Sequence, residues 1–153
     1  LGNELLNRHI LFDIRPDDSN PTDARIVIDP GKVSSLPKLP ATLSRFDSPK
    51  TVRVSANTSK SGEELTLHFV NYNREEPIKK RSAGGGIKDE KPIPVERIRV
   101  DLKIPDGKQI TAIHVTTPES PKLIALKFQQ NKARITFTIP KFLVYSVTRL
   151  KWK

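Results

Sequence analysis

A strict alternation of apolar and charged residues at positions 97–103 is the feature that most constrains the fold. In this run, RIRVDLK, Ile98, Val100 and Leu102 fall on one side of an extended chain and four charged residues fall on the other. A helix would distribute the same side chains around its axis. The run therefore predicts a strand with one buried face and one solvated face.

The same period of two recurs along most of the chain. Residues 65–70 and 134–139 alternate in this way, and β-rich runs predict further strands at 8–14, 25–29, 51–55, 110–116, 123–128 and 142–150. Only residues 1–7 could form a helical turn or two. About nine short strands, separated by turns such as Pro105-Asp106-Gly107, predict an all-β protein, an antiparallel β-sandwich of the immunoglobulin-like or Greek-key type. Its shared core is expected to contain Leu67, Phe69, Ile98, Val100, Leu102, Ile135 and Phe137.

The length of 153 residues allows one domain with a real core and is too short for two of ordinary size. We expect residues 48–153 to form the sandwich and residues 1–47 to be a linker or N-terminal strands that complete it. The chain starts on Leu1 and contains no methionine, which we interpret as a piece of a longer polypeptide. It has no cysteine, so disulfides and thiol chemistry are excluded. No apolar run is long enough for a membrane span.

The positive charge is confined to one half of the sequence. Residues 1–76 carry 10 Lys and Arg against 11 Asp and Glu, a net charge of −1, whereas residues 77–153 carry 17 against 6, a net charge of +11. Such an excess either lies on solvated strand faces or binds a polyanion such as an anionic polysaccharide. The long polar loop 73–94 offers possible polyanion contacts at Lys79, Lys80, Arg81, Lys88 and Lys91. No nucleic-acid recognition motif is present, so we expect no nucleic-acid partner.

Residues that could bind a metal ion are few. His9, His68 and His114 each lie in an expected strand without a second ligand at metal-like spacing, which favours ordinary strand histidines over a zinc site. A polar connection at 15–23 has oxygen ligands that could bind calcium or simply cap turns, without the pattern of an EF-hand loop. These calcium candidates are Asp17, Asp18, Asn20 and Asp23.

The sequence contains no recognisable catalytic constellation. Its acidic residues fall in loops or on outward strand faces, no serine lies in a nucleophile elbow, and the glycines at 84–86 are not followed by the residues of a phosphate-binding loop. We therefore expect neither a cofactor nor enzymatic activity from this chain alone. Exposed aromatic residues for stacking on sugars are also scarce, and we expect Tyr72 and Tyr145 to close the core with their hydroxyls in water.

Five segments, in order, carry a resemblance to a known domain type. Residues 65–72 (LTLHFVNY) resemble the "VHLVNY" strand of small β-sandwich domains that close many glycoside hydrolases. The neighbouring strands of those domains are similar to four further segments, at 48–54, 98–107, 113–118 and 137–147. The resemblance covers about residues 48–150, while the long loop after Tyr72 departs from it.

This resemblance implies a C-terminal accessory domain attached to an upstream catalytic domain of the same polypeptide, possessing no catalytic residues of its own. The implied parent is a glycoside hydrolase of bacterial type, secreted or periplasmic. Two alternatives to the accessory role stay open: a carbohydrate-binding module for an anionic polysaccharide and an independent enzyme. A sandwich fold alone cannot choose among these functions.

Overall fold

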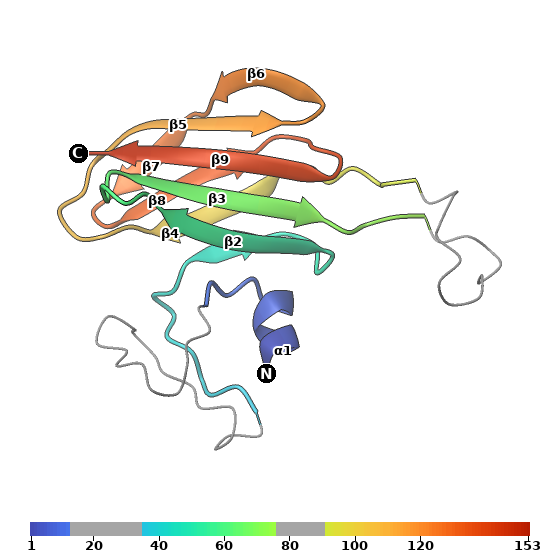
Figure 1. The fold of residues 1–153 in the computed structure, drawn as a ribbon. Helices are drawn as coiled ribbons and strands as arrows, with labels where there is room; N and C mark the ends of the chain where they lie inside the picture. The colour runs from blue at the N-terminus through green and yellow to red at the C-terminus, as the bar shows by residue number, and fades with distance from the viewer. Residues whose placement is uncertain (13–34, 76–90) are drawn as a thin grey trace.

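Two antiparallel sheets packed face to face make up nearly all of the computed structural model, which describes residues 1–12, 35–75 and 91–153 (Figure 1). The expected all-β sandwich is confirmed. Within the described residues, the chain forms α1 (Gly2–Asn7), β1 (Arg45–Asp47), β2 (Val52–Thr58), β3 (Glu64–Asn71), β4 (Ile98–Lys103), β5 (Ile110–Thr117), β6 (Ser120–Ala125), β7 (Phe128–Asn131), β8 (Arg134–Ile139) and β9 (Tyr145–Trp152). Among these residues, no helix has the length and apolar content that a membrane crossing requires.

The strand order places different loops at the two ends of the sandwich. One sheet has the order β1-β4-β8-β7 and the other β2-β3-β9-β5-β6. The β4–β5 loop and the C-terminus lie at one end, and the chain leaves β3 toward residues 72–75 at the opposite end (Figure 1). The two ends of the sandwich therefore carry different loops.

The core lies between the sheets, where the sequence pattern places it. All seven residues expected there are buried, and each is at most 5% exposed. Across the β4–β8 pair, Val100 lies opposite Phe137 and Leu102 opposite Ile135, so apolar side chains meet on the same face. The wet face of the β4 prediction is also confirmed in part, because Arg99 is exposed.

The inner face of β9 contains a buried hydroxyl that the apolar core does not satisfy. Thr148 lies opposite Leu67 on β3 and Val115 on β5, and its Oγ1 has no hydrogen-bond partner among the described residues. We expect Thr148→Val, which keeps the shape and removes the hydroxyl, to raise the free energy of unfolding by about 1 kcal/mol. Urea denaturation measures the change. Thr138→Val on the exposed face of β8 should stay within about 0.5 kcal/mol of wild type, and a destabilised Thr148→Val variant would contradict the prediction.

The expected strand at 8–14 is wrong over its described residues, because the chain there ends a helix. His9 has a φ of 54°, its amide donates to the Leu6 carbonyl at 3.1 Å, and the Ile10 amide donates to the Leu5 carbonyl at 3.0 Å. This pair of bonds closes α1 in the manner of a Schellman motif. His9 is buried, and its Nε2 lies 3.1 Å from the Pro49 carbonyl oxygen, so a contact distant in sequence fixes this bend.

Other strand boundaries also differ from the expectation. The run 123–128 was expected as one strand, but it contains the end of β6, a break and the start of β7. The last strand begins three residues later than expected, at Tyr145, and continues to Trp152. The expected strand at 25–29 lies outside the described residues. Turn residues at 105–107 are confirmed, and Gly107 has the positive φ of 79° that favours glycine there.

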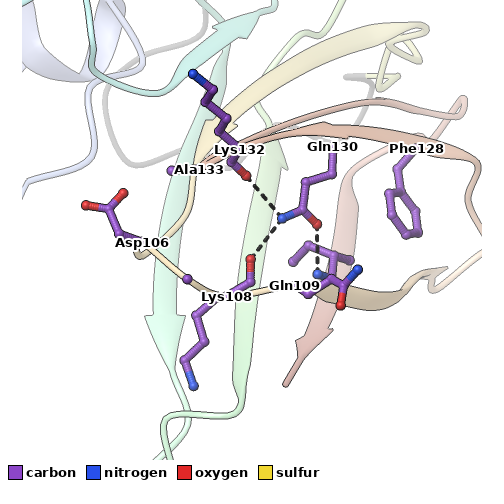
Figure 2. A pocket seen from close by; sticks show the side chains of 9 residues that line it. Asp106, Lys108, Gln109, Phe128, Gln130, Lys132 and Ala133 are labelled. Carbon is purple, nitrogen blue, oxygen red and sulfur yellow. Dashed lines mark hydrogen bonds between the residues drawn. The ribbon is translucent and has the colours of Figure 1, made fainter.

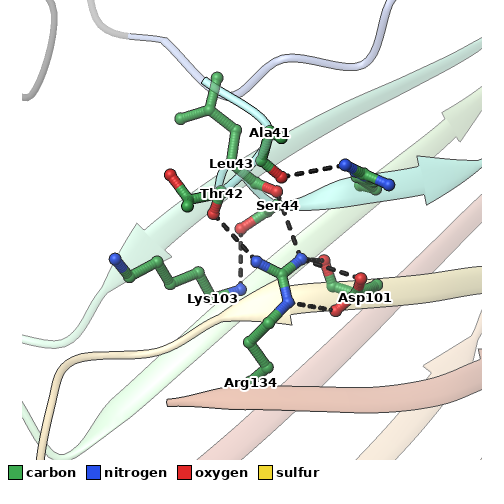
Figure 3. A network of polar contacts seen from close by, with 8 residues as sticks. Ala41, Thr42, Leu43, Ser44, Asp101, Lys103 and Arg134 are labelled. Atoms are coloured by element: carbon green, nitrogen blue, oxygen red, sulfur yellow. Dashed lines mark hydrogen bonds and ion pairs between the residues drawn. The ribbon is translucent and has the colours of Figure 1, made fainter. Parts of the chain in front are cut away.

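A guanidinium group fixes the segment before β1 to the sandwich (Figure 3). Arg134 on β8 forms a bidentate pair with Asp101 on β4, with both N–O distances at 2.8 Å, and donates to the carbonyls of Thr42 and Leu43 at 2.9 and 3.3 Å. β1 then pairs with β4. Residues 41–47, which belong to the expected N-terminal segment, are therefore joined to the sheet of the main domain.

Candidate functional site

A pocket of about 630 Å³ opens at the end of the sandwich that carries the β4–β5 loop (Figure 2). Its walls come from the β4–β5 loop with Asp106 and Lys108, from β7 with Phe128 and Gln130, and from the β7–β8 turn with Lys132. We call it the Gln130 pocket. Its volume lies within the range of about 300 to 1,000 Å³ that is usual for small-ligand sites.

The side-chain amide of Gln130 holds the pocket walls together. Its Nε2 donates to the carbonyl oxygens of Lys108 at 2.8 Å and Lys132 at 3.1 Å, and its Oε1 accepts the backbone N–H of Ile110 at 2.9 Å (Figure 2). One amide thus links both loops and the start of β5. Because all three bonds are to backbone, the amide itself serves as structure and leaves recognition to the side chains around it.

The charged groups of the pocket lie on its rim. Lys108 and Lys132 extend away from each other on opposite sides, with the Asp106 carboxylate on the rim as well, and the Phe128 ring lies beyond Gln130 (Figure 2). Lys132 begins the β7–β8 turn with a φ of 52°, a conformation that glycine adopts more readily. The arrangement offers two cations, one hydrogen-bond acceptor and one apolar ring.

This pocket does not contain the pair of carboxylates that glycoside hydrolysis requires. Among the residues that the structure describes, Asp106 is the one carboxylate that lines it. In the described part of the chain, the structure shifts the pKa values of three carboxyls, all of them outside the pocket, and it lowers each of these pKa values. Hydrogen bonds from Arg149 lower the pKa of Glu64, and a hydrogen bond from Lys141 lowers the pKa of Glu96.

The third shifted carboxyl, Glu119, has opposing influences. Burial is the largest and acts to raise its pKa, but hydrogen bonds from its own N–H, from the Thr117 hydroxyl and from the amides of Val144 and Leu143 together lower it. A general acid near neutral pH needs a raised pKa, so none of the three shifted carboxyls fits that role.

A buried asparagine organises the opposite end of the sandwich. The Nδ2 of Asn71 donates to the carbonyl oxygens of Ile93 at 2.8 Å and Leu143 at 2.6 Å, and its Oδ1 accepts the N–H of Asn73 at 3.0 Å. Its backbone N–H also donates to Val144 at 2.7 Å. Asn71 is 1% exposed, so these bonds join three chain segments within the protein.

Three residues whose backbones bond to or adjoin Asn71 expose apolar side chains at this end of the sandwich. Tyr72, Ile93 and Val144 are 57%, 37% and 37% exposed, and each is bonded through its own or a neighbouring backbone to the Asn71 cluster. We call these three residues the Asn71 patch. A second exposed apolar pair, Leu123 and Ile124, lies on the edge strand β6. Clustered exposed apolar residues are typical of interaction sites.

The residues singled out from the sequence are distributed as follows. Of the possible polyanion contacts, Lys91 is exposed, whereas Lys79, Lys80, Arg81 and Lys88 lie outside the described residues, as do the calcium candidates Asp17, Asp18, Asn20 and Asp23. Among the described residues, no group of three His, Asp or Glu side chains could hold a metal ion.

The three histidines occupy unrelated positions. His9 contacts Ser48 and Pro49 at the end of α1, which corrects its expected place in a strand, while His68 lies on β3 and His114 on β5. The Nδ1 of His68 lies 2.5 Å from the hydroxyl of Tyr145. The Tyr145 hydroxyl thus has a partner within the protein, and that Tyr145 is also wetted stays a prediction. Tyr72 is largely exposed and does not close the core.

The fold and its two ends define a class of protein: a β-sandwich with a pocket at one end, exposed apolar residues at the other and, in the described residues, no paired carboxyls lining that pocket. No protein-family model matches the chain, and no curated protein matches it in sequence. Solved structures do match its fold.

Alpha-L-fucosidase isoenzyme 2 from Paenibacillus thiaminolyticus is similar over 72% of this chain, with a TM-score of 0.57 and 14% identity. Cycloisomaltooligosaccharide glucanotransferase from Paenibacillus sp., solved with cycloisomaltoheptaose, is similar over 67%, with a TM-score of 0.50 and 16% identity. This chain spans only 15% and 14% of those two chains. The structural neighbours are thus carbohydrate-active enzymes that contain this fold as a small part.

Proposed function

We propose that this chain is a non-catalytic accessory domain of a larger carbohydrate-active protein and that it packs against the upstream catalytic domain of the same polypeptide. The observation that carries the proposal is the small share, 15% and 14%, of two carbohydrate-active enzymes that the fold covers. A part of that size is typical of an attached domain, since the chemistry of such enzymes needs a cleft with paired carboxyls.

The Asn71 patch is the surface that we assign to this packing. Tyr72 offers a large aromatic face with a polar hydroxyl, which is the kind of residue that dominates domain and protein interfaces. Ile93 and Val144, whose carbonyl oxygens accept hydrogen bonds from Asn71, add exposed apolar area at the same end, and the three bonds of the Asn71 side chain hold these segments in place. A pre-organised patch loses little conformational entropy when it is covered.

The packing can be tested by producing the upstream catalytic domain separately and titrating it with this chain. We expect Tyr72→Ser to weaken the association at least ten-fold, because a central aromatic contact contributes on the order of 2 kcal/mol. Isothermal titration calorimetry gives the dissociation constants. Tyr72 is already mostly exposed, so the variant should retain the wild-type fold and melting temperature.

Leu123→Ser on β6 is the matched control, since Leu123 is 60% exposed and lies on a different surface. We expect it to leave the association unchanged. If Leu123→Ser weakens binding and Tyr72→Ser does not, the packing surface is β6 and the assignment of the Asn71 patch is wrong. If the two domains show no association and no mutual change in hydrogen exchange when covalently linked, the accessory packing role itself is rejected.

A further inference from the structure

We propose that the Gln130 pocket binds an acidic sugar residue, one that bears a carboxylate or a sulfate group. This goes beyond the proposed accessory role, which requires no ligand at this end of the domain. The β4–β5 loop, which lines the pocket, lies at the opposite end of the sandwich from the end of β3 that carries Asn71 and Tyr72 (Figure 1), so a domain packed through the Asn71 patch leaves the pocket open to solvent. One domain could then hold its parent enzyme and a glycan at the same time.

The charges around the pocket favour an anion. Lys108 and Lys132 line it on opposite sides, and Lys153 lies beside it because its backbone exchanges two hydrogen bonds of 3.1 Å with Gln109 of the pocket wall. Among the described residues, three lysines thus lie at or beside the pocket, against one carboxylate that lines it, that of Asp106. Each ammonium ends a flexible four-carbon stem, so Lys108 and Lys132 can both turn toward a bound anionic group.

The other two side chains favour a sugar as the carrier of that anion. Phe128 is partly buried and presents part of its ring beside the pocket, and the apolar face of a pyranose packs well on such a ring. Asp106 can accept hydrogen bonds from sugar hydroxyls, which a simple anion lacks. A ring, an acceptor and two cations around one pocket match a residue that has an apolar face, hydroxyl groups and a negative charge.

The same side chains disfavour nucleic acid. Single-stranded nucleic acid is bound by several aromatic rings in succession along a basic groove, whereas the described residues that line this pocket include one aromatic side chain, Phe128. The Asp106 carboxylate would also repel a phosphate chain that passes through the rim. A single sugar residue in the pocket avoids this repulsion when its hydroxyls face Asp106 and its charged group faces the lysines.

The pocket is pre-formed, which lowers the conformational cost of binding. The Gln130 amide fixes the backbone at Lys108, Lys132 and Ile110, and hence the positions from which the recognising side chains extend. Ligand binding therefore needs to order only the ends of two lysine side chains. The Ile110 amide is an internal reporter of this site, since it donates to Gln130 and lies on the pocket wall.

The test is a titration of the isotope-labelled chain, followed by amide NMR, with trigalacturonate, its neutral methyl ester and a sulfated disaccharide. We expect at least one acidic probe to shift the amides of Ile110 and Ala133 and to bind at least ten-fold more tightly than the methyl ester, with binding that weakens as salt is added. The side-chain amide of Asn71, at the far end of the sandwich, should not shift.

Two variants test whether Lys132 and Lys108 recognise the negative charge of the ligand. Lys132→Gly removes one ammonium and relieves the positive φ, so it should retain or increase stability while it weakens acidic-probe binding about ten-fold, as for one charge-assisted hydrogen bond. Lys108→Gln should weaken it similarly. Lys122→Gln on β6 is the charge-matched control and should leave binding unchanged.

Several results would overturn the proposal. Equal binding of the ester and the acid, an equal loss in Lys122→Gln, or tighter binding of a trinucleotide would each show that the pocket does not select an acidic sugar. Failure of both acidic probes to bind would reject this pocket function and leave the accessory role unaffected, since that role is tested through Tyr72 at the other end.

Discussion

Replacing Phe69 by alanine is expected to lower the free energy of unfolding by about 3 to 5 kcal/mol. Phe69 is fully buried on β3, and its ring lies 6.1 Å from that of Phe46 in an edge-on arrangement and 6.5 Å from that of Phe142. Truncation removes the apolar transfer energy, leaves a cavity between the sheets and abolishes both aromatic contacts. Chemical denaturation monitored by fluorescence of the buried Trp152 measures the change.

The control for this variant is an apolar residue that contributes little to the core. Leu123→Ala on β6 should change the free energy of unfolding by less than about 0.5 kcal/mol, because the side chain is 60% exposed. A loss below about 1 kcal/mol for Phe69→Ala would mean that β3 presents the opposite face to the core, as a one-residue change of register would require.

Strands with strict alternation could be predicted from the sequence together with their buried face. In β4 the side chains from Ile98 to Leu102 alternate between apolar and charged, so each residue type indicates which face its side chain lies on. This works because successive side chains of a strand point to opposite faces of the sheet. The short β1 has only one buried residue, Phe46, and β7 has only one apolar residue, Phe128. Neither strand is long enough or apolar enough to show a period, so the sequence analysis missed β1 and reached only the first residue of β7, Phe128, at the end of the expected run 123–128.

The strand predicted after α1 was wrong for a different reason. Residues 8–14 are rich in β-forming side chains, but the described part of this segment is held by a helix end and by the contact of His9 with Ser48 and Pro49. Those partners are about forty residues away in sequence, at separations of 39 and 40. Local propensity cannot anticipate a tertiary contact that overrides it.

The candidate sites depend on the same kind of distant contact. The turn at 105–107 was predictable from its Pro, Asp and Gly, but its role as a pocket wall depends on Gln130, which binds a carbonyl 22 residues away. In the sequence, Gln130 and Asn71 look like ordinary polar strand residues. Nothing in the sequence shows which backbone groups their side-chain amides will bind. Fold class was therefore accessible from periodicity, whereas site geometry required the paired sheets.

The second prediction with a large effect concerns the stability contributed by the side chain of Asn71. We expect Asn71→Asp to lower the free energy of unfolding by about 3 to 5 kcal/mol at neutral pH, although the two side chains have nearly the same shape. The variant loses both donations from Nδ2, leaving the carbonyls of Ile93 and Leu143 facing a carboxylate oxygen at positions where the bonds are now 2.8 and 2.6 Å. Each buried group that loses its partner costs about 1 to 3 kcal/mol, and a buried unpaired charge adds to this.

The pH dependence of the stability of Asn71→Asp tests whether the charge of the introduced carboxylate causes the destabilisation. Burial next to two carbonyl oxygens should raise the folded-state pKa of the introduced carboxyl above its usual value of about 3.9, because its neutral form can donate one hydrogen bond. A raised folded-state pKa means that the variant is least destabilised below about pH 4 and loses stability as pH rises through that pKa. Denaturation at several pH values should show this trend relative to wild type, whereas Asn57→Asp, on an exposed position of β2, should differ from wild type by less than about 0.5 kcal/mol at every pH. A variant as stable as wild type at neutral pH would show that the amide of Asn71 does not hold the three segments together, and the pre-organisation of the Asn71 patch would have to be abandoned.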